Sequence, residues 1–514
     1  MPVNNKIIAK NTVFLYVRLL VIMAINFYMA RVVLEILGIL DYGIYNIVGT
    51  IVVIFTFLKS SLSEATQRFL NFEMGSCDSL ANLKKIFSTC MNCYFIFVIL
   101  VILLGEFFWF LGGCKLNIPL ERYEAASFTF HLSLLTFVVS ILQVPYNSTI
   151  IAYEKMDFFA WISIVEAVLK LLLTLWIKVI PYDKLHLYAF VLLMNSLAIL
   201  FVYILYCLKK FQVCKYVWVW EKALFRRIIS FTGWNMLGSF AAVLSDSGVN
   251  VLFNLFCGVV LNSSLGLTAQ INNTVKGFSS GYMTAFNPQI VKCYAAKEYI
   301  AFRKLFNRSS KISFFLFFMI SIPIIFNIDY LLSIWLVDVP QYTAEFTRII
   351  LFCSLIDATT SVFYTAVGAT GVIRNYQLSI SAIFLLHVFI TYILLLLGIP
   401  YVWVFFSRIL TRGILNFCVG VYFVRKQTSF RFSDYTQKTL YPIVEASIIP
   451  LLSMILLRVI MPDSDFLCFV FTILLFELIT VISIYKFGLD KTEKSVVDDK
   501  SRKMMAKIVN RCRC

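Results

Sequence analysis

Long apolar stretches alternate with short polar gaps along this chain. Each stretch is close to the roughly 20 residues that a helix needs to cross the hydrocarbon core of a bilayer. Because backbone polar groups in lipid must be hydrogen-bonded within their own segment, such stretches are expected to be helices. Their approximate bounds are 12–34, 39–58, 86–105, 125–144, 159–180, 187–207, 228–256, 264–287, 312–333, 347–367, 377–397, 401–424, 440–460 and 466–485. The pattern predicts an all-α polytopic membrane protein with about 14 transmembrane helices.

Composition agrees with this fold class. Hydrophobic residues make up 60% of the 514 residues and charged residues only 14%. A soluble domain of this size would bury a large core with far less apolar content. The segment 12–34 is too long for the apolar core of a signal peptide, so we interpret it as the first membrane helix.

The basic residues predict the orientation. Of the 45 Lys and Arg residues, 33 lie in gaps on the side of the N-terminus, and the loops on the other side carry only Lys115, Arg122, Lys178 and Lys184. By the positive-inside rule, both termini are therefore expected to be cytoplasmic. The net charge of +17 is spread over many short loops, which disfavours nucleic-acid binding. The basic tail 491–514 is expected either to lie on the anionic inner leaflet or to be solvated.

The sequence contains no motif of enzymatic chemistry. Its thirteen cysteines are scattered and fall mostly in apolar stretches, where Cys behaves as a small apolar residue. Cys90 and Cys93 form a C-x-x-C pattern, but no histidine or second pair accompanies it. Phosphate-binding loops and nucleophile elbows are missing from the sequence as well. We expect no enzyme activity, no cofactor and no metal site.

An internal repeat divides the chain. A shift of about 220 residues brings 37–43 onto 257–263, and 84–87 onto 303–306. The two copies start on the same side of the membrane, so the repeat is parallel. In transporters, the interface of two such halves holds the substrate site and moves by alternating access. The predicted parts are a six-helix lobe at 1–215, a second at 216–430, an appended helix pair at 431–490 and the basic tail 491–514.

Polar side chains gather on one face of two predicted helices. At about 100° per residue, they form a stripe on each helix. Their positions are Asn235, Ser239, Asp246 and Asn250 on 228–256, and Gln270 and Asn273 on 264–287. We expect these stripes to line a substrate cavity. The alternative is that they hydrogen-bond neighbouring helices, which polar membrane residues often do.

Eight cations lie inside the apolar stretches, where an unpaired charge costs at least about 2.5–3.5 kcal/mol. Arg31, Arg348 and Arg458 are near outer helix ends and are expected to reach the interface. Lys170 lies one turn after Glu166 and is expected to pair with it.

Four cations then remain as candidates for binding an anion: Arg18, Lys276, Arg408 and Arg412. The repeat places Arg18 and Lys276 in equivalent helix pairs that would face a shared cavity. Arg408 and Arg412 are one turn apart, so they could bind an anion together, or pair instead with Asp357 or Glu477.

Two carboxylates are candidates for ion or proton coupling. Asp246 lies on the polar stripe, and Asp357 lies in the middle of an apolar stretch. A carboxylate left alone in a membrane can carry a proton, whereas one paired with a cation is structural. Pairing of Asp246 with Arg18 or Lys276 is the competing interpretation.

Several short motifs resemble one family. They are Asn11-Thr12-Val-Phe-Leu-Tyr-Val-Arg18, Leu37-Gly38 with Asp41-Tyr42-Gly43-Ile-Tyr45, Ala65-Thr66-Gln67-Arg68-Phe69, and Pro145-Tyr146-Asn147 with Ala152-Tyr153-Glu154-Lys155-Met156. Together they resemble the polysaccharide-transport branch, with its Wzx-type flippases, of the multidrug/oligosaccharidyl-lipid/polysaccharide exporter superfamily. The resemblance implies a two-lobed flippase of the bacterial cytoplasmic (inner) membrane. Its substrate would be a polyprenyl-pyrophosphate-linked oligosaccharide, moved to the outer leaflet for O-antigen, capsule or exopolysaccharide assembly.

The implied partners are this lipid-linked glycan, membrane lipids, a polysaccharide polymerase and a coupling ion, H⁺ or Na⁺. A peptidoglycan-precursor flippase is a variant of the same class. A multidrug or cation exporter of the related branch is one alternative, but the buried charges lean basic, with eight cations against about five acids. A polymerase or glycosyltransferase is another, but the longest outer gap covers only about 106–124.

Overall fold

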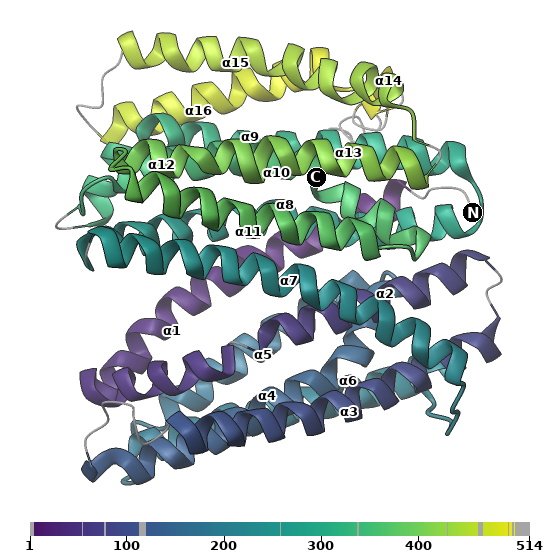
Figure 1. Cartoon of the computed structure of the whole chain (residues 1–514), viewed down its shortest axis with the longest axis vertical. Helices are drawn as coiled ribbons and strands as arrows, with labels where there is room; N and C mark the ends of the chain where they lie inside the picture. The colour runs from purple at the N-terminus through teal and green to yellow at the C-terminus, as the bar shows by residue number, and fades with distance from the viewer. Residues whose placement is uncertain are drawn as a thin grey trace, which may run out of the picture. The chain divides into compact units, whose positions relative to one another are not determined.

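The computed structural model describes residues 5–53, 55–76, 79–112, 120–257, 259–336, 339–428, 430–460, 466–491, 493–495 and 498. Every element in these ranges is helical. The first six long helices are α1 (Asn5–Val53), α2 (Thr56–Ser76), α3 (Leu80–Gly112), α4 (Tyr123–Ala152), α5 (Met156–Trp176) and α6 (Lys184–Lys210), with short 3₁₀ turns η2 (Leu120–Arg122) and η3 (Gln212–Cys214). Figure 1 shows them from purple to blue.

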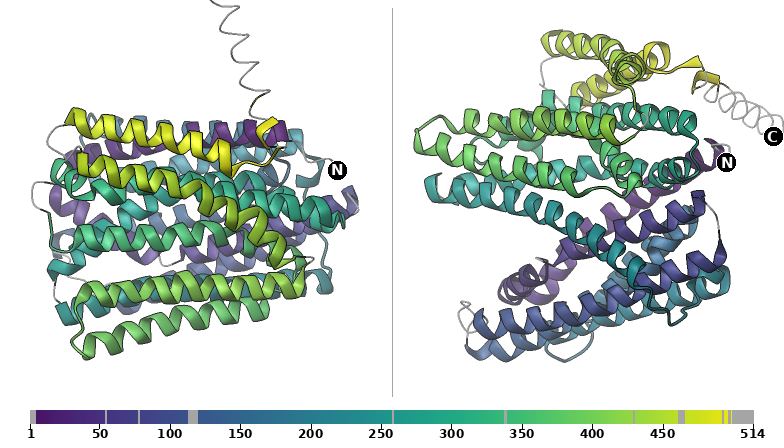
Figure 2. Two further views of the ribbon diagram at one scale, coloured as in Figure 1. Left: turned by 90° about the horizontal axis from the view of Figure 1, so that it is seen from above. Right: turned by 45° about the vertical axis from the view of Figure 1, so that its right-hand side comes forward.

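The later helices follow the same pattern. They are α7 (Lys222–Cys257), α8 (Val259–Ala295), α9 (Tyr299–Trp335), α10 (Thr343–Thr370), α11 (Arg374–Leu396), α12 (Tyr401–Arg408), the π-helical η4 (Ile409–Leu415), α13 (Asn416–Gln427), α14 (Phe432–Tyr435), η5 (Thr436–Leu440), α15 (Tyr441–Ile460), α16 (Phe466–Ser483) and η6 (Ile484–Gly488). Figure 2 shows the long helices of each part running alongside one another in two further views.

Twelve of the described helices are long and apolar enough to cross a membrane. The predicted stretches 39–58 and 264–287 are not among them. Both are nevertheless helical: α1 continues past Gly38 to Val53, α2 follows, and α8 is 37 residues long. The part of α1 after Gly38 (39–53) is too short to be counted as a span. Helices α2 and α8 carry too many polar residues to be recognised by hydropathy alone, a property that matters for the site.

A sharp bend at Gly38 divides α1. Its backbone has φ 71° and ψ 174°, a conformation that only glycine adopts without strain. The bend lies where the sequence predicts a short outer turn between the first two helices. The turn therefore requires the glycine of the Leu37-Gly38 motif.

The helix bounds repeat along the chain. α4 and α10 begin 220 residues apart, α5 and α11 218 residues apart, and α6 and α12 217 residues apart. These offsets match the shift of about 220 that aligns the sequence with itself.

Contacts divide the chain into two compact units. Unit 1 comprises Met1–Asp246, Ser280–Phe302 and Tyr364–Leu385, and unit 2 comprises Ser247–Ser279, Arg303–Phe363 and Leu386–Cys514. Helices α7, α8, α9, α10 and α11 therefore contribute residues to both units. The lobe boundaries at 215 and 430 follow the repeat rather than these contacts, and they stay a prediction.

Helix α2 shows how packing selects a helix of low hydropathy. Leu58, Leu62, Ala65 and Phe69 are buried at spacings of four, three and four residues, which places them on one face.

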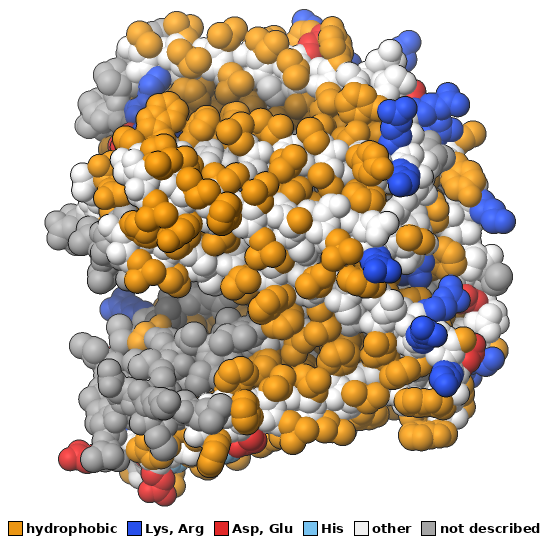
Figure 3. Space-filling model, viewed as in Figure 1, with side chains coloured by type: hydrophobic (Ala, Val, Ile, Leu, Met, Phe, Trp, Pro, Cys, Tyr) orange, Lys and Arg blue, Asp and Glu red, His pale blue; other side chains and the backbone are white. Residues whose placement is uncertain are grey.

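The large residues exposed on other helices, such as Leu103 and Trp161, are apolar. Figure 3 shows hydrophobic side chains along the length of the helices on this face, whereas Lys and Arg gather at the helix ends on the right. Such a surface is typical of a protein whose helix sides face lipid.

The segment after η6 is anchored rather than loose. Glu493 is 5% exposed and its Oε2 accepts a hydrogen bond from Nζ of Lys311 on α9 at 2.7 Å. Asp490 and Glu493 also accept from each other's backbone N–H groups, at 2.8 and 2.9 Å, as in a capping box. The predicted tail 491–514 thus begins against α9; residues 499–514 lie outside the described part.

Candidate functional site

Unit 2 contains a cluster of opposite charges around α10. Nζ of Lys276 on α8 lies 3.3 Å from Oδ2 of Asp357 on α10, and both side chains are about one-third exposed. The sequence had left Asp357 open as a partner for the cations of 401–424. Among the contacts seen, Lys276 is the cation at hydrogen-bond distance from it.

Two further cations join this cluster from the next helix. Cys353 lies close enough to Asp357, Arg408, Lys276 and Arg412 for their charges to act on its thiol. It also lies 3.8 Å from the backbone oxygen of Arg408. We call these four charged residues the α10 charge cluster. Three of these four residues are cations, and Asp357 is the carboxylate.

Local backbone geometry positions the two arginines. Arg408 ends α12 and Arg412 lies in the π-helical segment η4. A Cβ on Gly413 would come 3.1 Å from Cδ1 of Ile356, so the glycine lets this helix approach α10 closely. π-helical segments of this kind often occur at functional sites, because they redirect side chains.

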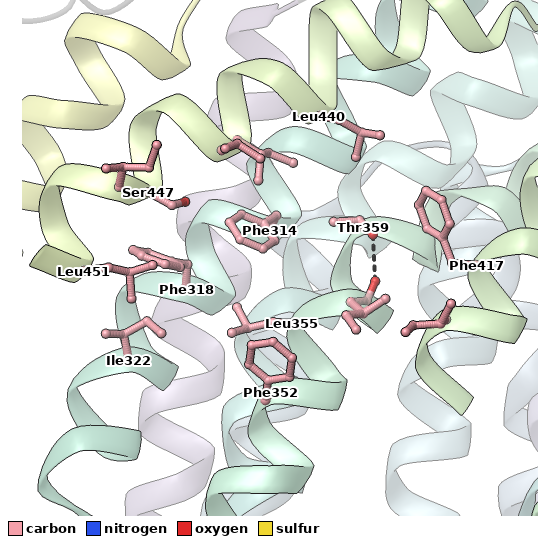
Figure 4. Close-up of a pocket in the computed structure, with 15 residues that line it drawn as sticks. Phe314, Phe318, Ile322, Phe352, Leu355, Thr359, Phe417, Leu440, Ser447 and Leu451 are labelled. Carbon is pink, nitrogen blue, oxygen red and sulfur yellow. Dashed lines mark hydrogen bonds between the residues drawn. The ribbon is translucent and has the colours of Figure 1, made fainter. Parts of the chain in front are cut away.

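An apolar pocket of about 510 Å³ opens beside the same helices (Figure 4). Fifteen residues line it, and only Thr359 and Ser447 among them are polar. Aromatic rings of Phe314 and Phe318 on α9, Phe352 on α10 and Phe417 on α13 point into it. Its last wall is the appended helix α15 with the end of η5. The volume falls in the range of about 300–1,000 Å³ that is typical of ligand pockets.

Helix α10 contributes residues both to the pocket and to the charge cluster. Its residues Phe352, Leu355, Ile356 and Thr359 line the pocket, and Asp357 belongs to the charge cluster. The helix through η4 and α13 also carries both kinds of residue. Arg412 belongs to the charge cluster, and Ile414 and Phe417 line the pocket. At about 100° per residue, Asp357 lies roughly 150° around α10 from the residues that line the pocket, so the pocket and the charge cluster occupy different faces of the same helix in unit 2.

Unit 1 has a separate group of charges near α5. Glu166 interacts electrostatically with Lys59, Lys170 and Arg18. The guanidinium of Arg18 also lies over the ring of Phe159, 4.5 Å from its centre. Lys170 and Glu166 interact as the spacing predicts, but Glu166 is shared with two further cations. Arg18 belongs to unit 1 and Lys276 to unit 2, so their shared cavity stays a prediction.

The polar stripe of α7 divides into two parts. Asn235 is fully buried and bonded to three side chains, and Ser239 accepts a hydrogen bond from Ser61 at 3.3 Å. These contacts agree with the alternative of helix–helix hydrogen bonding. Asp246 and Asn250 are exposed, as a cavity-lining role requires.

The polar residues of α8 also differ in role. Gln270 and Asn273 are exposed. Asn272 is buried, and its Oδ1 accepts a hydrogen bond from Ser354 on α10 at 2.8 Å. Exposed positions on α8 remain available for substrate, while Asn272 fastens α8 to α10.

Sequence reasoning missed a polar network on α2. Glu64 accepts hydrogen bonds from Nδ2 of Asn235 at 2.7 Å and from the hydroxyl of Tyr364 at 2.6 Å. Asn235 in turn accepts from Gln377 at 2.7 Å. The gap 59–85 had been interpreted as a loop, and its basic residues were counted for orientation. The buried spacing of Leu58, Leu62, Ala65 and Phe69 is the signal that could have revealed the helix.

Arg68 corrects one part of the loop interpretation. It is only 9% exposed, so it is a packed helical residue and no loop cation. Its Nε and Nη2 donate to the backbone oxygens of Gly368 and Ala369, at 3.1 and 3.2 Å. Rings of Phe69 and Phe72 flank it at 4.7 Å. Arg68 thereby satisfies carbonyls at the end of α10 that have no partner within the helix.

Motif residues that are far apart in sequence meet near Glu154. Its carboxylate accepts hydrogen bonds from Gln289 and Lys292 of α8, each at 2.6 Å. Its backbone oxygen accepts from Asn11 at 3.3 Å. The Asn11 and Glu154 motifs therefore have a structural role, because they fasten α1 and the α4–α5 turn to α8.

Ion pairs also join the opposite helix ends. Arg122, just before α4, bonds the carboxylates of Asp41 and Asp183. Burial opposes ionisation of Asp183, but hydrogen bonds from His186 and Arg122 outweigh it and lower its pKa to about 2. Asp183 also caps α6 by accepting from the backbone N–H groups of Leu185 and His186. Similarly, Arg348 pairs with Asp329, a partner that the interfacial prediction did not include.

Known proteins resemble the chain in structure but not in sequence. No protein-family model matches it, and no curated protein matches it in sequence. A MATE structure in the straight conformation matches with a TM-score of 0.66 at 12% identity, over 82% of this chain and 96% of that chain. The outward-facing structure of a multidrug resistance MATE family transporter of the MOP superfamily matches with a TM-score of 0.63 at 12% identity, over 82% and 97%.

A third structure is a MOP superfamily transporter from Pyrococcus furiosus, described by a reversed polarity of its binding pocket that suggests a different function. It matches with a TM-score of 0.66 at 12% identity, over 83% of this chain and 96% of that chain. At such low identity these likenesses show the fold. The chain has the all-helical fold of MATE and MOP superfamily transporters, which confirms the predicted fold class. The count of fourteen helices is not confirmed.

Proposed function

We propose that this protein is a flippase, which moves a polyprenyl-pyrophosphate-linked oligosaccharide from the cytoplasmic to the outer leaflet by alternating access. The observation that carries the proposal is the gathering of three cations in the α10 charge cluster, on a helix whose other face lines the apolar pocket. A pyrophosphate needs several cations, and a polyprenyl chain needs a long apolar surface. Lys276, Arg408 and Arg412 supply the first, and the pocket between α15 and α10 supplies the second.

Charge distinguishes this substrate from the main alternative. A multidrug exporter with the same fold would take cationic or neutral apolar compounds, and the apolar pocket alone would suit them. Three cations gathered at one site favour an anion over a cation. One solved relative in fold is described by a reversed pocket polarity, so this fold accommodates sites of different charge.

The remaining features fit the proposal. We place both termini in the cytoplasm and the protein in the bacterial inner membrane, because 33 of the 45 Lys and Arg residues lie in gaps on the side of the N-terminus. A polysaccharide polymerase is the expected consumer of the flipped product. The chain needs no nucleophile for this work, since no bond of the substrate breaks.

Complementation tests the proposal. The gene is placed in a strain that lacks its own surface-polysaccharide flippase but makes the matched repeat unit, and surface polymer and lipid-linked repeat units are measured. Rescue is expected. Drug resistance without rescue would support the multidrug alternative instead.

The double substitution Arg408→Ala/Arg412→Ala tests the charge cluster in the same assay. Each charge-assisted hydrogen bond to phosphate contributes about 1.5–3 kcal/mol, so we expect surface polymer to fall at least about tenfold at normal protein level. Arg425→Ala on α13 is the matched control, because Arg425 is exposed at the end of the same run of helix. Wild-type flux in the double variant would make these arginines structural.

A further inference from the structure

Three side chains from three helices of unit 1 form a closed triangle. Oε2 of Glu64 on α2 lies 2.7 Å from Nδ2 of Asn235 on α7 and 2.6 Å from the hydroxyl oxygen of Tyr364 on α10. That hydroxyl oxygen also lies 2.6 Å from Oδ1 of Asn235. Every side of the triangle is a short contact between two polar atoms, so every side needs its own hydrogen.

The neutral side chains do not supply enough hydrogens. The amide nitrogen of Asn235 donates one hydrogen to Glu64, and the amide oxygen has no hydrogen to donate. Tyr364 brings a single hydroxyl hydrogen, which faces both the carboxylate and the Asn235 oxygen. One hydrogen cannot point along two short contacts at once. If Glu64 were ionised, two oxygens would lie 2.6 Å apart with no hydrogen between them.

The opposite orientation of the Asn235 amide leads to the same result. Oxygen and nitrogen of an amide are assigned from their hydrogen-bond partners, so both orientations must be considered. With the amide turned, its nitrogen would donate to Tyr364, and Tyr364 would donate to Glu64. The Asn235 oxygen would then face Oε2 of Glu64 without a hydrogen. In either orientation, the missing hydrogen has to come from the carboxyl group.

We infer that Glu64 binds a proton in this arrangement, and that it is the proton-coupling site of the transport cycle. Its role in transport rests on the function proposed above, whereas the bound proton rests on the triangle alone. The side chain of Glu64 is exposed, so water can deliver and remove the proton without unfolding of the helix. This assignment differs from Asp246 and Asp357, the carboxylates that the sequence suggested.

The triangle is one half of a larger contact, which we call the α2–α10 clasp. One turn after Glu64, Arg68 donates to the backbone of Gly368 and Ala369, about one turn after Tyr364. A Cβ on Gly371 would come 2.6 Å from Nη2 of Arg68, and the glycine has φ +80°, so the turn after α10 is built to admit this guanidinium. Two successive turns of α2 thus hold two successive turns of α10.

The surroundings of Glu64 contain few other charges among the described residues. Tyr364 of α10 touches it, and the ring of Tyr376 on α11 lies 6.5 Å from that of Tyr364. Tyr94 of α3 bonds Thr66 on a different turn of α2. The further groups on these helices are Arg68 itself and Arg227 of α7, which interacts electrostatically with Arg68, and α4 contributes the uncharged Ser148 to Ser63. No carboxylate or cation is seen bonding Glu64 within the described residues, so its proton decides the charge of the triangle.

The proton balance of the device is simple. When α2 and α10 come together, the Glu64 carboxylate takes one proton from water and becomes a neutral acid that donates within the triangle. When the proton leaves, two facing oxygens lose their hydrogen and repel each other, which weakens the Glu64 half of the clasp. One proton is bound on closing and one is released on opening.

Infrared difference spectroscopy tests the bound proton without any transport substrate. The full-length protein in lipid nanodiscs is compared between mildly acidic and mildly alkaline pH. We expect the carbonyl band of a protonated carboxyl group that disappears in Glu64→Gln and persists in Glu73→Gln. Glu73 is the matched control because it lies on the same helix, is not part of the triangle, and its carboxylate accepts only from Asn82 in the contacts seen. A band unchanged by Glu64→Gln would overturn the inference.

Two more variants keep this test decisive if Glu64→Gln does not fold. Tyr364→Phe removes one side of the triangle and keeps the carboxyl, so the band should shift in frequency but remain. Glu64→Asp keeps a carboxyl on a shorter side chain and should also shift the band. If neither variant moves the band, it arises elsewhere and the assignment to Glu64 is wrong, even if Glu64→Gln fails to fold.

Transport of the lipid-linked oligosaccharide in proteoliposomes forms the second arm. Wild-type flux should depend on pH, and Glu64→Gln, which imitates the protonated state permanently, should reduce flux to the level of empty vesicles at every pH. Normal pH-dependent flux in Glu64→Gln would refute the coupling role. If wild type fails to carry this substrate, the proposed function fails, and the infrared arm still decides whether Glu64 holds the proton.

Discussion

At the scale of single residues, the structure depends on where a charge finds its partners. Arg68 is buried without a carboxylate in the contacts seen, and its guanidinium instead bonds two carbonyls and lies between aromatic rings. A planar group with several fixed donors suits this position, and an ammonium does not. The identity of this side chain therefore matters more than its charge.

We expect Arg68→Ala to destabilise the protein by about 3 kcal/mol, because two charge-assisted hydrogen bonds are lost at once. Arg68→Lys should restore less than half of that loss. Apparent melting temperatures of the purified protein measure both effects, and Arg425→Ala, an exposed change, should stay within about 0.5 kcal/mol of wild type. Full rescue by lysine would show that the positive charge of Arg68, and not its planar set of donors, stabilises the fold.

Asp183 makes a second prediction at this scale. Its pKa is lowered to about 2 in the folded protein, against about 3.9 in the unfolded chain. Its contribution to stability is therefore present above about pH 4 and is lost as the pH falls from about 4 to about 2. Arg122→Gln removes one cause of the low pKa, so this variant should be less stable at neutral pH, by up to roughly 2 kcal/mol, and lose less on acidification. Parallel acid-unfolding curves for the two proteins would contradict this expectation.

At the scale of elements, polar contacts hold helices that hydropathy does not recognise. α2 and α8 carry too many polar residues to be counted as spans, yet α2 is clasped to α10, and α8 is fastened to Glu154 and to Ser354. The segment after η6 is held in the same manner by Glu493. These contacts are long-range in sequence, so their energy is unavailable to any local propensity.

Glu493 offers the test at this scale. Lys311 and Glu493 are about 4% and 5% exposed, and removal of one partner of a buried pair is expected to cost about 3–5 kcal/mol. Glu493→Ala should therefore lower the apparent melting temperature clearly, while Glu493→Leu/Lys311→Met should be milder because Lys311 no longer leaves a buried charge without a partner. Arg308, which lies 3.7 Å from Glu493, loses this carboxylate in both variants. Arg425→Ala is the exposed control. Equal melting temperatures for the single and double variants would show that the pair is not the cause.

At the scale of the whole molecule, the fold is that of a membrane transporter, and its orientation stays a prediction. A tag at each terminus should be shielded from membrane-impermeant reagents added to intact cells, because the basic helix ends favour the cytoplasm. A tag in the loop between α3 and α4 should be labelled. Labelling of either terminus in intact cells would reverse the orientation and the direction of transport that we propose.

The sequence predicted the class, the helices and the repeat, because apolar length and periodicity are local properties of the chain. It also singled out Lys276, Arg408, Arg412 and Asp357, since charges within apolar stretches are rare. It failed at Glu64 and Arg68, which lie past the end of a hydrophobic stretch and resemble loop residues. Their significance follows only from Tyr364 and the end of α10, some 300 residues away.

The sequence by itself therefore determined that this is a polytopic helical membrane protein with an internal repeat and unusual buried cations. Tertiary structure alone decided which of these cations gather, that the apolar pocket lies on the other face of α10, and that Glu64, Asn235 and Tyr364 form one triangle. The physical reason is the distance along the chain over which each interaction acts. Burial of a helix in lipid is decided within about 20 residues, whereas a hydrogen bond between side chains is decided by distances that only the packed helices fix.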